Sequence, residues 1–406
     1  MNMKVKTDKE IIERILTKGV EQILPSKEAL RKLLESGKRI RIYQGFDPTA
    51  NSLHIGHAAH LHKLEDFREL GHDVICVIGD FTARIGDPDK KSVRKPLTKE
   101  DVEENMQSFK EQIGKILDID NKENPVQFRY NSEWLEELKF ADILELASNF
   151  SVQQMLKRDM FQKRIEENRP IYIHEFMYPI MQAYDSVVLD TDIQLGGNDQ
   201  LFNILAGRHL MSMLKNKEKI VMTGKLLTAS DGTKMGKTEG NMIRMDDTPE
   251  NIYGKIMAFN DDSILSAFEI LTFATMDEVK KYQERLDSGE NAMNLKKELA
   301  FRVTSEITSE KEAERAQKYF ESIFQKKEQE VEIPLKKIGE EEIALNELLV
   351  KINFAVSKSE AKRLVEQGAV KINDKKATEF NQILAIKNSQ PIILKVGKKV
   401  CSIAYN

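Results

Sequence analysis

The feature that most constrains this sequence is the alternation of short, apolar, β-rich runs with longer helical stretches. Residues 55–70, for example, have the pattern of a helix and lie between two such runs. This order is typical of a parallel sheet whose connecting helices cover its faces. The sequence therefore predicts an α/β fold, with strands at residues 39–44, 74–78, 187–189 and 220–222.

The rest of the chain has a different character. Residues 141–167 and 249–324 read as helical throughout, and Pro249 stands where a helix would begin. Residues 326–342 are rich in Lys and Glu and carry few apolar side chains, which is typical of a linker. We expect an α/β domain over residues 1–240 with a helical insertion at about 130–180, a helical domain over 241–325, the linker, and a tail domain over 343–406.

The net charge of −4 conceals an uneven distribution along the 406 residues. Residues 343–406 contain 11 Lys or Arg against 5 Asp or Glu, whereas residues 1–342 contain 51 against 61. A basic tail on an acidic body indicates a polyanionic partner at one end of the chain, although a run of charge is more often a solvated face.

The cysteines and the apolar runs bear on the cellular setting. Cys76 and Cys401 have no Cys/His cluster beside them, so neither a disulfide framework nor a thiolate zinc site is indicated. No uncharged apolar run reaches membrane-spanning length. We therefore expect a cytoplasmic protein without membrane association.

The first candidate site follows the first expected strand. A turn over residues 43–49 leads to Leu53-His54-Ile55-Gly56-His57, which opens a long helix. Unpaired amides and the dipole at a helix N-terminus attract phosphate, and Gly56 leaves room for a nucleotide beside the backbone. His54 and His57 are three apart and would face that ligand together. Ordinary surface or core histidines are the alternative, and a metal site that includes His60 lacks an evident third ligand, so no metal site is predicted.

The second candidate site is a loop of Gly, Ser and Thr over residues 225–238 that carries Lys234 and Lys237. Ammonium groups on such a loop can stabilise the negative charge that grows on a departing pyrophosphate. Taken alone, a loop of this composition is far more often a solvated surface. In this order and spacing, however, the two sites resemble the paired signatures of class I aminoacyl-tRNA synthetases.

Four further motifs narrow the resemblance to the tyrosyl-tRNA synthetases. They are Tyr43-x-Gly45-x-Asp47-Pro48-Thr49, Ile85-Gly86-Asp87-Pro88, Tyr178-x-x-x-Gln182-x-x-Asp185 and Gln194-x-Gly196-Gly197-x-Asp199-Gln200. The spacing of the third motif places its polar side chains on one helical face, and a buried face carries such groups only where a polar partner meets them.

The resemblance implies a fold, a reaction and partners. The fold is a Rossmann-like, parallel-sheet nucleotide-binding domain, followed by a helical domain and a small α+β RNA-binding domain. The reaction activates L-tyrosine with ATP, which enters with Mg²⁺, and transfers tyrosine to the 3′ end of tRNA(Tyr). Positioning and charge stabilisation carry catalysis, with no covalent protein intermediate. Members of the family are homodimers, so we expect one here.

The resemblance also implies roles for single residues. Asp185 and Tyr43 bind the phenol, Tyr178, Gln182 and Asp87 bind the ammonium group, and Gln200 belongs to the same tyrosine site. The adenosine and ribose are lined by Gly45, Asp47, Gly197, Asp199 and His57. The triphosphate is faced by Thr49, His54, Lys91, Arg94, Lys234, Lys237 and Thr238.

The chain departs from the family pattern in two places. Asp89-Lys90 stands where the family usually has Ser-Gly, which leaves the register of Lys91 and Arg94 open. Gly236 and Thr238 replace the serines of the Lys-Met-Ser-Lys-Ser consensus, a change common among tyrosyl enzymes.

Two rival functions remain at this point. One is a tryptophanyl enzyme or another nucleotidyltransferase with the His-x-Gly-His motif, and the pairing of Asp185 with Tyr43 argues against it. A pocket that hydrogen-bonds a hydroxyl rejects a substrate without one, and rejection of phenylalanine by tyrosyl-tRNA synthetases is the standard example. The other rival is an RNA-binding protein that has lost catalysis, which the intact histidines and loop lysines disfavour.

The tail carries a pattern of its own. Ser357 is placed to cap a basic amphipathic helix, Gly368 to end it, and a short strand follows. This resembles the small RNA-binding module of a ribosomal small-subunit protein and of bacterial-type tyrosyl-tRNA synthetases. The resemblance assigns phosphate contacts, with little sequence discrimination, to Lys358, Lys362, Arg363 and Lys371; a merely solvated basic helix is the alternative.

Overall fold

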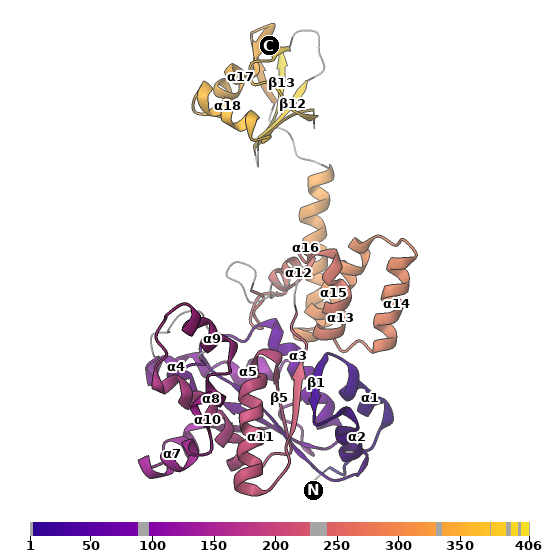
Figure 1. Ribbon diagram of the computed structural model, residues 1–406. Coiled ribbons are helices and arrows are strands. Elements are labelled where there is room, and N and C mark those ends of the chain that lie inside the picture. Colours follow the sequence, from indigo (N-terminus) through magenta and orange to yellow (C-terminus); the bar gives the residue numbers. More distant parts are fainter. Residues whose placement is uncertain are drawn as a thin grey trace. The chain divides into compact units, whose positions relative to one another are not determined.

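The computed structural model describes residues 3–87, 97–227, 242–329, 335–373, 375–386, 391–396 and 399–405. The chain divides into two compact units, Met1–Phe320 and Glu321–Asn406 (Figure 1). Each unit buries hydrophobic residues of its own, which is the mark of an independent core. Among the described residues, no helix is long and apolar enough to cross a membrane.

The first unit is built on a six-stranded sheet in the order β1-β6-β5-β2-β3-β4. Its strands are β1 Val20–Leu24, β2 Arg41–Phe46, β3 Asp73–Ile78, β4 Gln127–Tyr130, β5 Ile193–Gly197 and β6 Ile220–Gly224. All neighbouring pairs are parallel except β1 with β6. The predicted parallel α/β sheet is therefore confirmed. The chain runs from β2 to β3 on one side and later returns through β5 on the other, so the carboxyl ends of β2 and β5 form the crevice where such sheets bind ligands.

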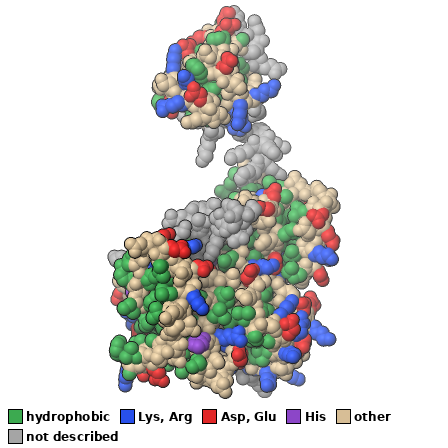
Figure 2. All heavy atoms as spheres, viewed as in Figure 1, with side chains coloured by type: hydrophobic (Ala, Val, Ile, Leu, Met, Phe, Trp, Pro, Cys, Tyr) green, Lys and Arg blue, Asp and Glu red, His purple; other side chains and the backbone are tan. Residues whose placement is uncertain are grey.

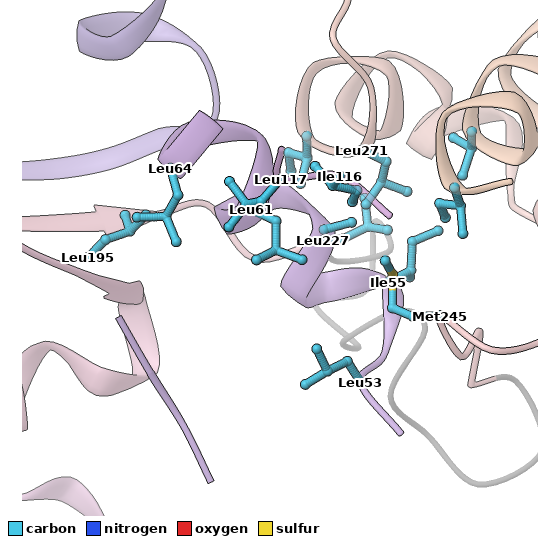
Figure 3. Packing of buried hydrophobic residues seen from close by; sticks show 14 of the residues in the cluster. Leu53, Ile55, Leu61, Leu64, Ile116, Leu117, Leu195, Leu227, Met245 and Leu271 are labelled. Carbon is cyan, nitrogen blue, oxygen red and sulfur yellow. The ribbon is translucent and has the colours of Figure 1, made fainter. Parts of the chain in front are cut away.

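Successive side chains of a strand point to opposite faces of the sheet, so each face carries apolar side chains that helices cover. Ile42, Val74 and Cys76 belong to the core that α3 Ile55–Glu69 shares with α1 Lys9–Thr17 and α13 Ile264–Leu271, whereas Tyr43 and Ile75 belong to a separate cluster with Trp134. Figure 3 shows Leu61 and Leu64 of α3 lying toward Leu195 of β5, with Ile55 beside Met245. The paired helices α10 Ile173–Leu189 and α11 Leu201–Lys215 complete the first unit's α/β part.

The remaining helices of the first unit lie between or after these elements. They are α2 Lys27–Glu35, η1 Thr82–Arg84, α4 Lys99–Met106, α5 Phe109–Ile113, α6 Ser132–Leu135, α7 Phe140–Ala147, α8 Val152–Met155, α9 Asp159–Glu166, η2 Asn198–Gln200, α12 Pro249–Met257, η3 Asp261–Ser263, α14 Met276–Asp287, α15 Ala292–Ile307 and α16 Glu310–Gln329. Thr248 caps α12 by accepting the amide of Asn251, and Pro249 is its first residue, as the sequence predicts.

One predicted strand is wrong. Residues 187–189 form the last turn of α10, and the strand lies six residues later as β5. The run Val-Val-Leu reads as β-rich, but Val187 packs against the helices α10 and α11 in one apolar cluster. Asp190, with φ of 47°, then ends the helix in the left-handed conformation. Tertiary packing overrides the β propensity of these side chains.

The predicted continuous helix over residues 141–167 is also wrong, because the segment is divided into α7, α8 and α9. Ser151 accepts a hydrogen bond from the amide of Gln154 at 3.2 Å, which starts a new helix at that point. Local caps of this kind interrupt a segment whose composition alone favours helix.

The expected linker over residues 326–342 also differs from the structure. The helix α16 runs to Gln329, and β7 Leu335–Ile338 already pairs in parallel with β13 Lys399–Tyr405 of the tail. Two consecutive lysines in β7 make this segment resemble a linker in the sequence, although a strand at the edge of a sheet tolerates charged side chains.

The second unit is a small α+β fold. It contains a sheet in the order β10-β9-β12-β13-β7, a two-stranded ladder of β11 with β8, and the helices α17 and α18. Ser357 accepts the amide of Glu360 at the start of α18 Lys358–Glu366, and Gly368 follows it with φ of 67°, so both predicted helix signals are confirmed. The other elements are β8 Glu342–Ala344, α17 Leu345–Lys351, β9 Val370–Ile372, β10 Lys375–Lys376, β11 Ile383–Ala385 and β12 Ile392–Val396.

Candidate functional site

A cavity of about 500 Å³ opens at the carboxyl ends of β2 and β5. This volume suits a small-molecule ligand of nucleotide size. Its lining includes most of the residues that the sequence assigns to a tyrosine or nucleotide site. They are Gly45, Asp47, Thr49, His54, His57, Asp87, Tyr178, Gln182, Asp185, Gly197, Asp199 and Gln200. The structure thus brings together residues that are more than 150 positions apart in the sequence.

The N-terminus of α3 forms one wall of the cavity. His54 and His57 stack with ring centroids 4.0 Å apart, and the backbone amide of His54 donates to Nδ1 of His57 at 3.1 Å. A Cβ at Gly56 would lie 3.0 Å from the ring of His54, so any larger residue there would press on the histidine. Both histidines lie together at the start of α3, where the amides of Ile55 and His57 already donate to the carbonyls of Ile243 and His54.

The predicted lysine loop begins and ends beside this helix terminus. Lys225, Leu226 and Leu227 line the cavity before the loop, and Met242 lines it afterwards. Ile55 donates its amide to the carbonyl of Ile243 at 2.8 Å. Both ends of the loop are thus fixed at the cavity; Lys234, Lys237 and Thr238, together with Lys91 and Arg94, lie outside the described residues.

Asp47, at the end of β2, joins two parts of the site. Its Oδ2 accepts a hydrogen bond from the hydroxyl of Tyr178 at 2.7 Å, and its Oδ1 accepts one from Thr82 at 2.9 Å. A Cβ at Gly79 would overlap this carboxylate, which explains glycine at that position. Burial, followed by the charge of Asp47, raises the pKa of Tyr178 well above its ordinary value, so the phenol stays protonated and acts as the donor.

Asp185 is a buried carboxyl at the opposite wall, on α10. Trp134 donates its indole N–H to Oδ1 at 2.9 Å. Burial raises the pKa of Asp185 to about 8, while the hydrogen bonds from Trp134 and Asn131 and the charge of Lys219 act in the opposite direction. A buried carboxyl facing a cavity is costly unless a ligand pairs with it, so this position predicts a hydrogen-bond donor on the ligand.

Tyr43 differs from the other predicted tyrosine ligands because it is absent from the described lining of the cavity. Its ring is fully buried, and its hydroxyl lies 2.8 Å from Oγ of Ser186 and 3.3 Å from the carbonyl oxygen of Gln182. Asp185 is close enough for its charge to act on Tyr43, so the phenol of Tyr43 lies just behind the cavity wall. Its contact with a ligand remains a prediction.

Asp87 lines the cavity and has several partners. Arg158 donates to Oδ1 at 2.8 Å, and Oδ2 accepts from Gln200 at 2.9 Å and from Asn203 at 3.1 Å. Arg158 belongs to the insertion between α8 and α9 and is buried against Phe202. These donors hold the carboxyl group of Asp87 beside the cavity, with its oxygens on the side where a ligand would bind.

The cavity lining also includes His60, Gly197 and Asp199. Burial lowers the pKa of His60 to about 4, and its ring is held by the side chain of Gln44 at 3.1 Å, so the imidazole is neutral near pH 7. A Cβ at Gly197 would lie 2.5 Å from Oδ1 of Asp199, so the β5 glycine permits the close turn into η2. Among the described residues, no group of three His, Cys, Asp or Glu side chains could hold a metal ion.

The second unit presents a row of lysines on one sheet face. Lys376 of β10 is the cross-strand partner of Lys371 of β9, and Lys371 is in turn the partner of Lys395 of β12. Residues directly opposite one another point to the same face, and like charges there are destabilising unless an anion covers them. By contrast, the predicted contacts Lys358 and Lys362 pair with Glu347 and Glu366 on the same unit.

Several of these residues were not predicted from the sequence. Lys376 could have been found from the hairpin register around Asn373, but Lys395 on β12 and the partners of Asp87 and Asp185 could not. Arg158 and Trp134 reach the site from an insertion whose sequence reads only as helix.

Comparisons with known proteins agree along the chain. The family model described as tRNA synthetases class I (W and Y) matches residues 35–325, and the model described as Tyrosine--tRNA ligase SYY-like C-terminal domain matches residues 325–403. A tyrosine–tRNA ligase of Thermotoga maritima is 41% identical over 389 residues, and one of Carboxydothermus hydrogenoformans is 42% identical over 398 residues. In both cases the match covers 95% of each chain.

Solved structures support the fold. A C-terminally truncated mitochondrial tyrosyl-tRNA synthetase of Aspergillus nidulans has a TM-score of 0.66 at 23% identity and covers 78% of this chain and 95% of its own. A tyrosyl-tRNA synthetase of Archaeoglobus fulgidus, complexed with L-tyrosine, has a TM-score of 0.59 at 22% identity and covers 76% of this chain and 99% of its own.

Proposed function

This chain belongs to the tyrosyl-tRNA synthetases of class I, and from that membership we propose which of its residues carry each step of tyrosine activation and transfer. The enzyme is a tyrosine–tRNA ligase: it forms tyrosyl-adenylate from tyrosine and ATP and then loads tyrosine onto its tRNA. The observation that carries the residue assignment is a single cavity lined both by the buried carboxyl of Asp185 and by the α3 terminus with His54 and His57. An amino-acid site and a phosphate site thus share one space.

The side chain of tyrosine binds at the α10 wall. Asp185 accepts the phenolic proton, and Tyr43 donates to the phenol oxygen from behind the wall. Asp87, Tyr178 and Gln182 bind the ammonium group, with Gln200 holding Asp87. Arg158, Gln200 and Asn203 donate to the carboxyl group of Asp87 and hold it at the cavity.

ATP, as its magnesium complex, binds across the crevice between β2 and β5. Gly45 and Gly197 permit its adenosine to approach the backbone, and Asp47 and Asp199 lie beside the ribose. His57 also lies beside the adenosine and ribose, and the side chains of Thr49 and His54 face the phosphates at the start of α3, where the helix dipole favours negative charge. The tyrosine carboxylate then attacks the α-phosphorus in line, pyrophosphate leaves, and a ribose hydroxyl of tRNA later takes the acyl group.

Lys234, Lys237 and Thr238 are assigned to the departing pyrophosphate, because both ends of their loop line the cavity. We predict that Lys237→Ala lowers the rate of adenylate formation by about tenfold to a hundredfold, since a donor aimed at developing charge acts mainly in the transition state. Tyrosine affinity should stay unchanged. Single-turnover adenylate formation measures both quantities, with Lys215→Ala on the exposed end of α11 as control. Unchanged activation in the Lys237 variant contradicts this assignment.

The RNA contacts are assigned to the second unit. Arg363 and the lysine row of Lys371, Lys376 and Lys395 are the primary phosphate contacts, because the like charges lie side by side. Lys358 and Lys362 join them when their glutamate partners release them. Such contacts give affinity with little base discrimination.

We also propose a homodimer that forms through the exposed apolar face of α7 to α11. Phe140 is 75% exposed, Leu144 56%, Ile173 80% and Met213 60%. Figure 2 shows hydrophobic side chains gathered over α7 to α10. A large exposed apolar area of this kind marks a protein–protein contact.

A reducing cytoplasm is the proposed location, because Cys76 and Cys401 are buried free thiols in different units.

We predict that the double variant Phe140→Glu, Ile173→Glu sediments as a monomer, whereas the unaltered chain sediments as a dimer. Charge on an apolar contact face opposes association, since each carboxylate would have to be desolvated. Val356→Glu, at a position 89% exposed in the second unit, is the control. Sedimentation equilibrium distinguishes the states, and a monomeric unaltered chain would rule out the proposed dimer.

A further inference from the structure

Lys219 is a lysine that the proposed reaction does not use, although it lies behind the tyrosine site. It precedes β6 and has no exposed surface. Its ammonium donates to Oγ of Ser186 at 2.8 Å and to Oε1 of Gln194, and it lies 5.8 Å from the centroid of the Tyr43 ring. Within the described part of the chain, no carboxylate forms a salt bridge with it. A buried lysine without an ion pair is costly, so its presence calls for a reason.

The fold makes room for this ammonium. Gly207 lies in the interior of α11, where glycine is unfavourable. A Cβ there would lie 2.8 Å from Oγ of Ser186 and closer still to Nζ of Lys219. The glycine is therefore matched to the buried lysine and serine, and the three positions form one built site.

The hydrogen bonds around Lys219 have a direction. An ammonium group only donates, so Ser186 accepts from Lys219 and its own proton is left for another oxygen. The hydroxyl oxygen of Tyr43 is the closer acceptor, at 2.8 Å, and Oε1 of Gln194 lies at 3.3 Å. Tyr43 then keeps its own proton for an acceptor on its other side. In this structure that acceptor is the carbonyl oxygen of Gln182, at a long 3.3 Å.

The charge of Lys219 also acts on Asp185. Burial lowers the pKa of Lys219 and raises that of Asp185, and the attraction between the two opposes both shifts. Each residue thus favours the charged form of the other across the wall of the tyrosine site.

We propose that Lys219 is a specificity-determining positioning residue: through Ser186 it orients the Tyr43 hydroxyl as a donor to the phenol of bound tyrosine. The proposal rests on the assignment of the phenol to Asp185 and Tyr43. Lys219 touches no substrate; it sets the direction in which the Tyr43 hydroxyl donates. Its loss should therefore affect tyrosine more than phenylalanine, which has no hydroxyl to bind.

The test measures pyrophosphate exchange with tyrosine and with phenylalanine in two variants. Lys219→Met keeps the length of the side chain without charge or donor, and Lys219→Gln keeps a donor without charge. In the Met variant we expect the tyrosine-to-phenylalanine ratio of kcat/KM to fall about tenfold or more, through the tyrosine KM, with kcat within about twofold. The Gln variant should retain an intermediate ratio, because its amide still donates to Ser186.

Lys217→Met is the matched control, since Lys217 is two residues away and pairs with Asp190 and Asp192 outside the site. The single tryptophan, Trp134, donates to Asp185, so its fluorescence reports tyrosine binding directly. An unchanged ratio in a folded Lys219→Met variant overturns the proposal, and so does an equal loss for both amino acids, which would show a merely structural role. Should both Lys219 variants fail to fold, Ser186→Ala carries the same test, because it removes the link to Tyr43.

The control for the underlying function is the unaltered chain itself. If it shows neither tyrosine-dependent exchange nor a fluorescence change with tyrosine, the proposed site assignment fails first. If it shows both and the Lys219 variants keep full discrimination, only the role of Lys219 fails.

Discussion

Replacing Asp185 with Asn is expected to reduce the preference for tyrosine over phenylalanine by about a hundredfold or more. The amide oxygen of Asn can still accept from Trp134, but its NH₂ group then faces the cavity, so the phenolic proton has no acceptor. Leaving a buried donor unpaired costs about 1–3 kcal/mol, which lowers kcat/KM for tyrosine roughly tenfold to a hundredfold. Phenylalanine gains at the same time, because it no longer leaves a buried carboxylate unpaired.

Pyrophosphate exchange with each amino acid measures this preference, and the titration of Trp134 fluorescence measures tyrosine binding alone. Asp190→Asn is the matched control, since Asp190 ends the same helix and its side chain is 49% exposed. Asn suits its left-handed backbone with φ of 47°. Intact discrimination in the Asp185 variant would show that the phenol binds elsewhere in the cavity.

A chain that ends after Gln329 is expected to make tyrosyl-adenylate at the full rate and to charge tRNA poorly. Every residue assigned to tyrosine and ATP precedes this point, and the two units have separate buried cores. If each phosphate contact contributes about 1 kcal/mol, the loss of four weakens tRNA binding by roughly three orders of magnitude. It also flattens the slope of log affinity against log salt by about three.

Aminoacylation at low tRNA concentration should therefore fall and recover partly as tRNA is raised, while pyrophosphate exchange stays constant. A full-length variant with Lys371, Lys376 and Lys395 changed to Ala separates the charge from the fold of the unit, and it should lose part of the affinity and part of the salt slope. If truncation abolished exchange as well, the second unit would support the catalytic fold, and the division of labour between the units would be wrong.

The sequence predicts much of this site because its motifs are local and its strands point to one edge of the sheet. Gly45 lies near the end of β2 and Gly197 ends β5, while Asp47, Thr49 and Asp199 follow these strands, so two neighbouring parallel strands bring all five residues together. The helical spacing of Tyr178, Gln182 and Asp185 likewise places all three in the cavity wall.

What the sequence does not predict depends on contacts between distant segments. The residues 187–189 carry strand formers, yet packing on α11 makes them helical. Arg158 and Trp134 belong to an insertion whose sequence predicts only helix. No helical or strand periodicity of the sequence relates them to their partners Asp87 and Asp185. Lys219 directly precedes an apolar strand, a position where a lysine is usually solvated. Its burial depends on the space that Gly207 leaves and on the hydrogen bond to Ser186, which come from distant segments of the sequence.

The central claim is that this one cavity activates tyrosine, and amino-acid-dependent exchange of labelled pyrophosphate into ATP tests it most directly. The purified chain should catalyse exchange when tyrosine is added, far more slowly with phenylalanine, and not at all with tryptophan or without an amino acid. The reaction needs no tRNA, so it isolates the cavity from the second unit. Exchange that depends on tryptophan would contradict this claim. So would a folded chain that shows no exchange with tyrosine and no change in Trp134 fluorescence when tyrosine is added.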